Sequence, residues 1–160
     1  MKNEIKMIPR IYIDISIVGG FFDEEFSVAT QALFERLKKG EVVFVVSDLL
    51  KKELIRAPLH VQELFQNYEE NCFEHVELTE EARKLADNYI EAKVVGKASL
   101  EDCQHIAIAT IQKVDVLASW NFRHIVNLDK IKGYNGINLK NGYAIIEIRN
   151  PKDLINYEND

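Results

Sequence analysis

Apolar residues recur at helical spacing between Ser99 and Val114. They are Cys103, Ile106, Ala107, Thr110, Ile111 and Val114, and together they give this segment one apolar face. The spacing predicts an amphipathic helix with Ser99 as its N-cap. After Lys113 the pattern changes to a short buried strand at residues 115–119, followed by the polar cluster WNFRH. Loops that follow the strands of an α/β sheet carry chemistry, so this cluster is a candidate functional site.

Strands and helices alternate along the rest of the chain. A nearly continuous apolar run at residues 10–16 predicts a strand that is buried on both faces. Further strands are predicted at 41–46, 73–78 and 143–148, helices at 25–39, 49–57, 59–71 and 79–95, a loop at 128–142, and a short terminal helix beginning at Asn150 and Pro151. This alternation predicts an α/β fold with a mainly parallel sheet covered on both faces.

Composition favours one compact domain over residues 1–160. Hydrophobic residues make up 47% of the 160 positions, and three prolines with seven glycines leave no long linker. The start of the chain lacks a signal-peptide core and no apolar run reaches a membrane-spanning length, so we expect a cytoplasmic protein with no membrane contact. Cys72 and Cys103 have no close-spaced partner and are expected to be free thiols in the core.

The net charge of the chain excludes few functions. A net charge of −6 argues against a protein that coats nucleic acid nonspecifically, because such binding needs many cationic contacts to phosphate. It does not exclude a nuclease, since a metal-dependent site contributes carboxylates whose charge bound cations offset.

Two acidic residues occupy positions that suit either chemistry or helix capping. Asp14 ends the first buried strand, where an unpaired charge is costly, so it should face a cation or a helix N-terminus. The alternative is a purely structural role, in which Asp14 caps a helix beginning at Ile15. Asp102 lies in the first turn of the Ser99 helix, where it can be a capping partner and nothing more.

Two segments resemble a known family. The pattern Asp102-x-x-His105-Ile106-Ala107-x-Ala109, then Asp115, then Ser119-Trp120-Asn121-Phe122-x-His124-Ile125 resembles the C-terminal half of a PIN domain. It is most similar to VapC-like toxins that carry a Ser-Trp-Asn-Phe segment. Asp14-x-Ser16 followed by Gly19-Gly20 resembles the opening of the same family.

The resemblance implies a fold, an activity and a site. PIN domains are metal-dependent ribonucleases built on a small three-layer α/β/α sandwich with an acidic cluster. The matching positions are Asp14, Glu53 and Asp102, which would hold Mg²⁺ or Mn²⁺ at one edge of the sheet. Without the family, Glu53 would be interpreted as part of a solvated helix face beside lysines. The resemblance further implies an RNA substrate, an antitoxin protein that covers the acidic site, and a homodimer.

The sequence departs from the family at the fourth acidic position, which is Asn121 here. An amide oxygen or a bridging water can still serve there, with weaker metal affinity, so Asn121 stays among the expected catalytic residues. Asp115 is a poor substitute because it starts its strand. At about 3.3 Å per residue it lies well over 10 Å from the strand's far end.

Four further residues are expected to contact substrate: Ser16, Ser119, Arg123 and His124. Arg123 can pair with a phosphate. For both His105 and His124 a hydrogen-bonded structural role is favoured, with substrate contact as the less favoured alternative. Trp120 can stack on a base, although core packing is favoured.

Functions from other classes compete with the nuclease. A noncatalytic binding module that keeps the fold after losing full metal ligation is the stronger competitor, and Asn121 is its best argument. An aspartyl phosphatase of the haloacid dehalogenase type is weaker, because Ser16 stands where that class needs a second aspartate. Nucleotide-binding folds are disfavoured because the chain lacks GxGxxG and GxxxxGK[ST] loops.

Overall fold

A five-stranded parallel sheet forms the centre of the computed structural model, which describes residues 7–155. The strands are β1 (Arg10–Ile13), β2 (Val43–Ser47), β3 (Phe73–Val76), β4 (Val116–Ala118) and β5 (Ile148–Arg149), in the order β3-β2-β1-β4-β5. Every neighbouring pair is parallel, and Ile11 of β1 is in register with Phe44 of β2 and Val116 of β4. The predicted α/β class with a mainly parallel sheet is confirmed.

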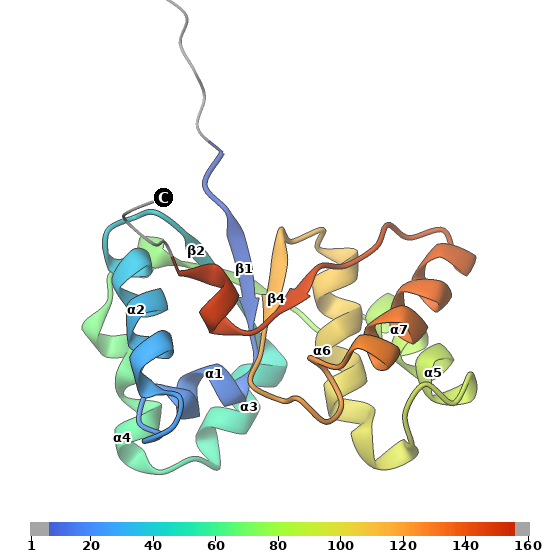
Figure 1. The fold of residues 1–160 in the computed structure, drawn as a ribbon, viewed down its shortest axis with the longest axis horizontal. Helices are drawn as coiled ribbons and strands as arrows, with labels where there is room; N and C mark the ends of the chain where they lie inside the picture. Colours follow the sequence, from blue (N-terminus) through green and yellow to red (C-terminus); the bar gives the residue numbers. More distant parts are fainter. Residues whose placement is uncertain (1–6, 156–160) are drawn as a thin grey trace, which may run out of the picture.

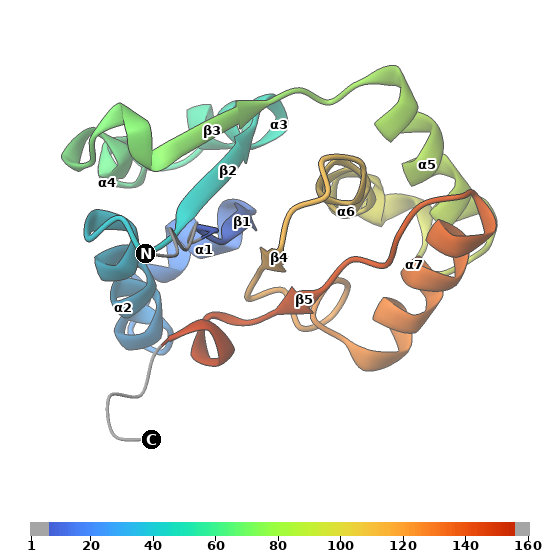
Figure 2. The same cartoon turned by 90° about the horizontal axis from the view of Figure 1, so that it is seen from above.

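Helices cover both faces of this sheet (Figures 1 and 2). They are α1 (Ile15–Gly20), α2 (Ser27–Lys38), α3 (Asp48–Ile55), α4 (Leu59–Gln62), α5 (Glu80–Glu91), α6 (Leu100–Ile111) and α7 (Leu128–Lys140), with short 3₁₀ helices at Leu64–Asn67, Glu70–Cys72, Lys97–Ser99 and Pro151–Leu154. One layer contains α1, α2 and α4, and the opposite layer contains α5, α6 and α7. None of the helices described is long and apolar enough to cross a membrane.

Alternate residues of the strands build two separate cores. Tyr12 of β1 packs with Leu117 of β4 and the buried faces of α5 and α6. Ile11 and Ile13 point the other way and pack against α1 and α2. This follows from the period of two along a strand, and it explains why the first strand has an almost continuous apolar sequence.

Residues 128–142 were predicted to be a loop, and this prediction was wrong. They contain the helix α7, which begins at the cap Asn127 and packs against α5. The apolar face of α7 is small, so the hydrophobic period in its sequence is weak. Polar contacts compensate: the buried Asn138 is hydrogen-bonded to Tyr89, and Tyr134 donates to the His124 carbonyl at 2.6 Å.

Two other predictions need correction. The final strand is β5 at Ile148–Arg149 rather than 143–148, because residues 143–147 are not part of a strand and Ile145 is exposed. The helix predicted at 59–71 is divided into α4 and two 3₁₀ segments. Within α2, Val28 is 82% exposed, and the buried face consists of Ala29, Thr30, Leu33, Phe34 and Leu37.

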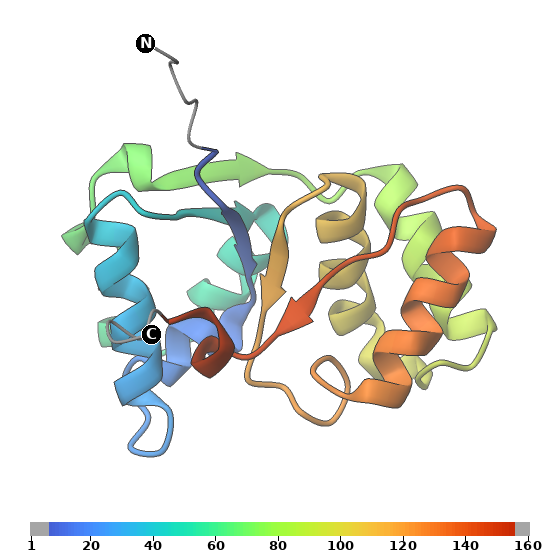
Figure 3. The same cartoon turned by 45° about the horizontal axis from the view of Figure 1, so that its top comes forward.

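Parallel strands bring their carboxyl ends to one edge of the sheet, which we call the carboxyl edge. Asp14 directly follows β1, Ser47 ends β2 and starts α3, and Ser119 directly follows β4. Figure 3 shows β1 and β4 side by side, with the segments that leave them turning into α1 and into the loop before α7. Residues far apart in sequence therefore meet at this edge, as expected for an open α/β sheet.

Candidate active site at the carboxyl edge

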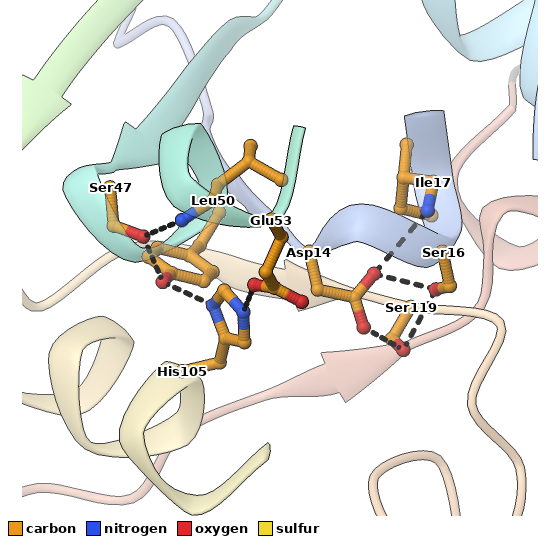
Figure 4. Close-up of polar contacts among 9 residues, drawn as sticks. Asp14, Ser16, Ile17, Ser47, Leu50, Glu53, His105 and Ser119 are labelled. Atoms are coloured by element: carbon orange, nitrogen blue, oxygen red, sulfur yellow. Dashed lines mark hydrogen bonds and ion pairs between the residues drawn. The ribbon is translucent and has the colours of Figure 1, made fainter. Parts of the chain in front are cut away.

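Asp14 is held at the carboxyl edge by three hydrogen bonds (Figure 4). Its Oδ1 accepts from Ser16 Oγ at 2.6 Å and from the Ile17 backbone N–H at 3.3 Å, so Asp14 does cap α1. Its Oδ2 accepts from Ser119 Oγ at 2.5 Å. The residue is only 4% exposed. Burial raises the pKa of Asp14, while His105 and the two hydroxyl donors act in the opposite direction.

The two serines also fix the loop that follows β4. Ser16 Oγ accepts the Trp120 backbone N–H at 2.8 Å, and Ser119 Oγ accepts the Asn121 N–H at 3.0 Å. Ser16 and Ser119, both expected to contact substrate, therefore use their hydroxyls to hold Asp14 and the start of the loop. This arrangement explains how the Ser-Trp-Asn segment positions an aspartate more than one hundred residues away.

Glu53 projects from α3 and ends a buried chain of polar groups. Its Oε1 lies 2.5 Å from His105 Nε2 of α6. The other ring nitrogen, Nδ1, lies 2.6 Å from the Tyr12 hydroxyl, which contacts Ser47 Oγ at 2.9 Å. Ser47 Oγ in turn accepts the Leu50 N–H at 3.1 Å and caps α3 (Figure 4). The chain ties β1, α3 and α6 together beneath the carboxyl edge.

Asp102 lies in the first turn of α6 and is paired with His124 from the loop after β4. The distance from His124 Nδ1 to Asp102 Oδ2 is 3.3 Å. Burial raises the pKa of Asp102, and the nearby charge of Glu53 adds to that increase, while His124 and His105 lower it. Ser99 occupies the N-cap position of α6 but makes no capping hydrogen bond with its side chain.

The imidazole of His105 lies among the three acidic residues. It contacts Glu53 directly, and it is close enough to Asp14 and Asp102 to lower the pKa of each. Asp102 and His105 are three residues apart on α6 and so lie on one face of the helix. His105 thus contacts Glu53 and exerts an electrostatic influence on both Asp14 and Asp102.

These donors suit a hard divalent cation in chemical type. All three are carboxylates, the ligands that Mg²⁺ and Mn²⁺ prefer. Burial raises the pKa values of Asp14 and Asp102, and at Asp102 the charge of Glu53 adds to the effect. In the conformation described, Asp14 and Glu53 are hydrogen-bonded to neighbours, and Asp102 lies 3.3 Å from His124 Nδ1. Within residues 7–155, no three His, Cys, Asp or Glu side chains are arranged to share one ion. The donors therefore fit such an ion in chemical type, and their side chains are not gathered around one in this conformation.

Asn121, expected at the fourth ligand position, uses its amide oxygen in a turn. Its Oδ1 accepts the backbone N–H groups of Arg123 at 3.2 Å and His124 at 2.9 Å. This is the capping geometry that Asn and Asp adopt in tight turns. Asn121 therefore orients the loop that carries His124 toward Asp102.

Asp115 lies at the opposite end of the strands, as expected from its place at the start of β4. Its Oδ2 accepts the backbone N–H of Arg10, the first residue of β1, at 2.7 Å. Trp120 packs in the core: it is 6% exposed, stacks on Phe26 and donates from Nε1 to Thr30 Oγ1 at 2.9 Å. Arg123 is exposed beside the site.

Comparison with known proteins supports the architecture. No protein-family model matches the sequence, and no curated protein matches it. Among solved structures, the chain is similar to a chain in the crystal structure of VapBC2 from Rickettsia felis bound to a DNA fragment from their promoter. The TM-score is 0.54 at 12% identity, over 88% of this chain and 98% of that chain. The chain has a PIN-like fold.

Sequence reasoning missed part of what surrounds the acidic residues of this PIN-like fold. From sequence, Tyr12 is interpreted only as part of a buried strand and Ser47 only as a helix cap. A hydrogen-bonded structural role is favoured for His105, and its contact with Glu53 cannot be predicted from the sequence alone. One sequence feature did indicate that His105 lies near the acidic residues: its spacing of three from Asp102 places both side chains on one face of α6.

Proposed function

We propose that this protein is a metal-dependent endoribonuclease that hydrolyses RNA phosphodiester bonds. The observation that supports the proposal is that His105, at the carboxyl edge of a PIN-like fold, contacts Glu53 and influences the pKa values of both Asp14 and Asp102. Three carboxylates lie at one edge, and two of them have raised pKa values. A bound cation would stabilise their ionised forms, which is consistent with a metal-dependent site.

Asp14, Glu53 and Asp102 would hold Mg²⁺ or Mn²⁺. When bound, such an ion activates a water for attack on phosphorus and stabilises the charge that develops on the leaving oxygen. Ser16 and Ser119 keep the Asp14 carboxylate in one orientation, and His105 does the same for Glu53. A fixed donor set reduces the reorganisation that binding requires.

The loop after β4 would meet the substrate. Arg123 is exposed, and its guanidinium can pair with a phosphate oxygen in a bidentate manner. His124 is partly buried, and its pairing with Asp102 gives it a positioning role at the acidic site. Asn121 would contribute by shaping this loop through its turn hydrogen bonds.

A toxin of a type II toxin–antitoxin pair is the biological role that we propose for this nuclease. Its support is the similarity to the VapBC2 structure over 88% of the chain. The partner would be a cognate antitoxin that covers the acidic edge with a basic side chain, and the toxin would form a homodimer. Expression of the chain alone should arrest growth, and coexpression of a small neighbouring reading frame should relieve the arrest.

The activity is tested with purified full-length chain and a labelled single-stranded RNA. We expect cleavage with Mg²⁺ or Mn²⁺, none in EDTA, and loss of cleavage in Asp14→Asn. Asn remains a good N-cap, so this variant should keep α1. Asp115→Asn is the matched control, because it changes the same functional group at the other end of the strands. Cleavage that survives EDTA or Asp14→Asn would refute the proposal.

A noncatalytic binding module of the same fold is the second candidate. The observation in its favour is that Asp14 and Glu53 already have hydrogen-bond partners, that Asp102 is paired with His124, and that the amide oxygen of Asn121 is occupied in a turn. Mn²⁺ titration separates the two candidates, because a module that has lost its metal site should show no saturable binding that depends on Asp14.

A further inference from the structure

A shallow hollow of about 370 Å³ lies between the end of α5 and the start of α7, and we call it the lysine hollow. It is lined by Ile90, Lys93, Val94, Val95, Gly96, Lys97 and Lys130. Three of these seven residues are lysines and none is acidic, although the whole chain carries a net charge of −6. The hollow is therefore a local concentration of positive charge on an acidic protein.

Two of the three lysines are exposed to solvent, and the third, Lys130, is half-buried. Lys93 and Lys97 are exposed, and they belong to the connection between α5 and α6. Lys130 comes from the first turn of α7, and its Nζ donates to the Val94 carbonyl at 2.8 Å, which ties α7 to this connection. Figure 3 shows the connection beside the first turns of α7.

The lysine charges have no acidic partner within the structure described. Across residues 7–155, every ion pair with an N–O distance of 4.0 Å or less involves an arginine or a histidine. An ammonium group free of carboxylates keeps its full attraction for an external anion. A lysine is a flexible point charge, which suits successive phosphates of variable geometry.

The lysine hollow adjoins the acidic site through two chain segments. The 3₁₀ turn Lys97–Ser99 leads directly into α6, whose first turn carries Asp102. On the other side, Asn127 caps α7 by accepting the Lys130 N–H at 3.2 Å, a few residues after His124. Asp102 and His124 are themselves paired, so the cationic hollow and the acidic edge are neighbouring parts of one surface.

We propose that the lysine hollow binds the phosphate backbone of an RNA strand whose scissile bond lies at the acidic edge. This inference rests on the proposed function and adds the path of the substrate. Carboxylates repel phosphates, so a polyanion that reaches the acidic edge needs cations flanking it. Lys93, Lys97 and Lys130 provide them on the α6 and α7 side, where the positive ends of two helices add to the favourable potential.

The test is the salt dependence of RNA binding, measured by fluorescence anisotropy with a labelled single-stranded RNA. The Asp14→Asn chain serves as parent, so that the probe is not cut. In that background, Lys93→Gln, Lys97→Gln and Lys130→Gln are combined. Each phosphate contact contributes about 0.7 to the slope of log K against log salt for single strands, so the triple variant should lose about 2 units. Affinity at low salt should fall roughly tenfold or more.

The control variant combines Lys38→Gln, Lys39→Gln and Lys113→Gln. These lysines are also exposed, and they lie toward the other end of the strands. Lys113 matches Lys93 in having a positive φ, 53° against 61°, so backbone strain is the same in both sets. The control should keep the parent's affinity and slope.

The outcomes are distinguishable. A parent that binds RNA while the hollow variant keeps its slope would overturn this inference and leave the nuclease proposal intact. Equal losses in the hollow and control variants would also overturn it, because they would show only a net-charge effect. A failure to bind RNA at any salt concentration, both in the Asp14→Asn parent and in the native chain held in EDTA, would refute the proposed function and this inference together.

Discussion

His105 Nε2 lies 2.5 Å from Glu53 Oε1, which joins α6 to α3 under the carboxyl edge. His105 is 1% exposed, and its other ring nitrogen contacts the Tyr12 hydroxyl, which is itself fully buried. The His105 ring and the Tyr12 hydroxyl cannot turn to water if a partner is removed, whereas the Glu53 side chain is partly exposed. The contact therefore stabilises the fold as well as orienting a proposed metal ligand.

His105→Leu should destabilise the protein by about 1–3 kcal/mol, because it leaves the Glu53 carboxylate without its partner and removes one of the two hydrogen bonds of the buried Tyr12 hydroxyl. Tyr12→Phe should cost less, about 0.5–1.5 kcal/mol, since the pair of His105 and Glu53 survives. Both values come from urea unfolding in EDTA. The control is His75→Leu, which removes an exposed His–Glu pair and should change stability by less than about 0.5 kcal/mol. Equal effects at His105 and His75 would contradict the assigned role.

Asp14 should make the stability of the metal-free protein depend on pH. Burial raises the pKa of Asp14 above the value of about 3.9 that an unfolded chain has. Between these two pKa values the folded state binds more protons than the unfolded state, so stability falls as pH rises through that window. Asp14→Asn lacks this titration and keeps a capping side chain.

The measurement compares urea unfolding of the parent and Asp14→Asn in EDTA across a pH series that begins near 4. The parent should lose stability relative to the variant as pH rises, and the difference should become constant once Asp14 is fully ionised. A difference that grows in favour of the parent would mean that the carboxylate is stabilised by its donors more than burial penalises it.

The core strands were predictable from sequence because burial on both faces leaves an unmistakable apolar run, as in β1 and β2. Helix α7 was not, because its buried surface includes Asn138 and its stability depends on partners in α5 and α6. Tyr89 contacts that asparagine from α5, and Asn138 donates to Thr110 of α6 at 3.3 Å. Such pairings exist only in three dimensions.

The acidic positions were predictable for a different reason. Asp14 and Asp102 stand at element boundaries that a strand-and-helix pattern reveals, whereas Glu53 was found only through the family resemblance. The role of Asn121 could not be read from sequence. In the sequence alone, an asparagine that caps a turn cannot be distinguished from one that binds a metal. The structure distinguishes them, because the Asn121 amide oxygen accepts the backbone N–H groups of Arg123 and His124.

Asn121→Asp should tighten Mn²⁺ binding. An aspartate at this position can accept the same two backbone N–H groups with one oxygen, so the turn should persist, while its second oxygen and its charge become available to a cation. Isothermal titration of Mn²⁺ into parent, Asn121→Asp and Asp115→Asn decides it. Asp115→Asn should leave the affinity unchanged, because Asp115 bonds the Arg10 backbone at the far end of the strands. A loss of Mn²⁺ affinity in Asp115→Asn, with no gain in Asn121→Asp, would show that the fourth metal-ligand position is wrongly assigned to Asn121.

Two adjacent glycines of α1 provide a matched test of how the loop after β4 is anchored. A Cβ at Gly20 would lie 2.7 Å from Trp120 Cδ1 and Nε1 and 3.0 Å from Thr30 Oγ1, whereas a Cβ at Gly19 would meet nothing within 4 Å. Gly20→Ala must therefore displace the indole from its contacts with Thr30 and Phe26. It should cost about 1–3 kcal/mol, the usual range for overpacking.

Gly19→Ala should instead stabilise the helix by about 0.5–1 kcal/mol, because alanine loses less backbone entropy than glycine. Urea unfolding gives both values, and fluorescence reports the displacement directly, since Trp120 is the chain's only tryptophan. Emission should shift in Gly20→Ala alone. The backbone N–H of Trp120 donates to Ser16 Oγ, and Ser16 also donates to Asp14. Gly20→Ala should therefore weaken Mn²⁺ binding, whereas Gly19→Ala should not. Unchanged emission with unchanged stability at Gly20 would mean that Trp120 does not pack against α1 as described.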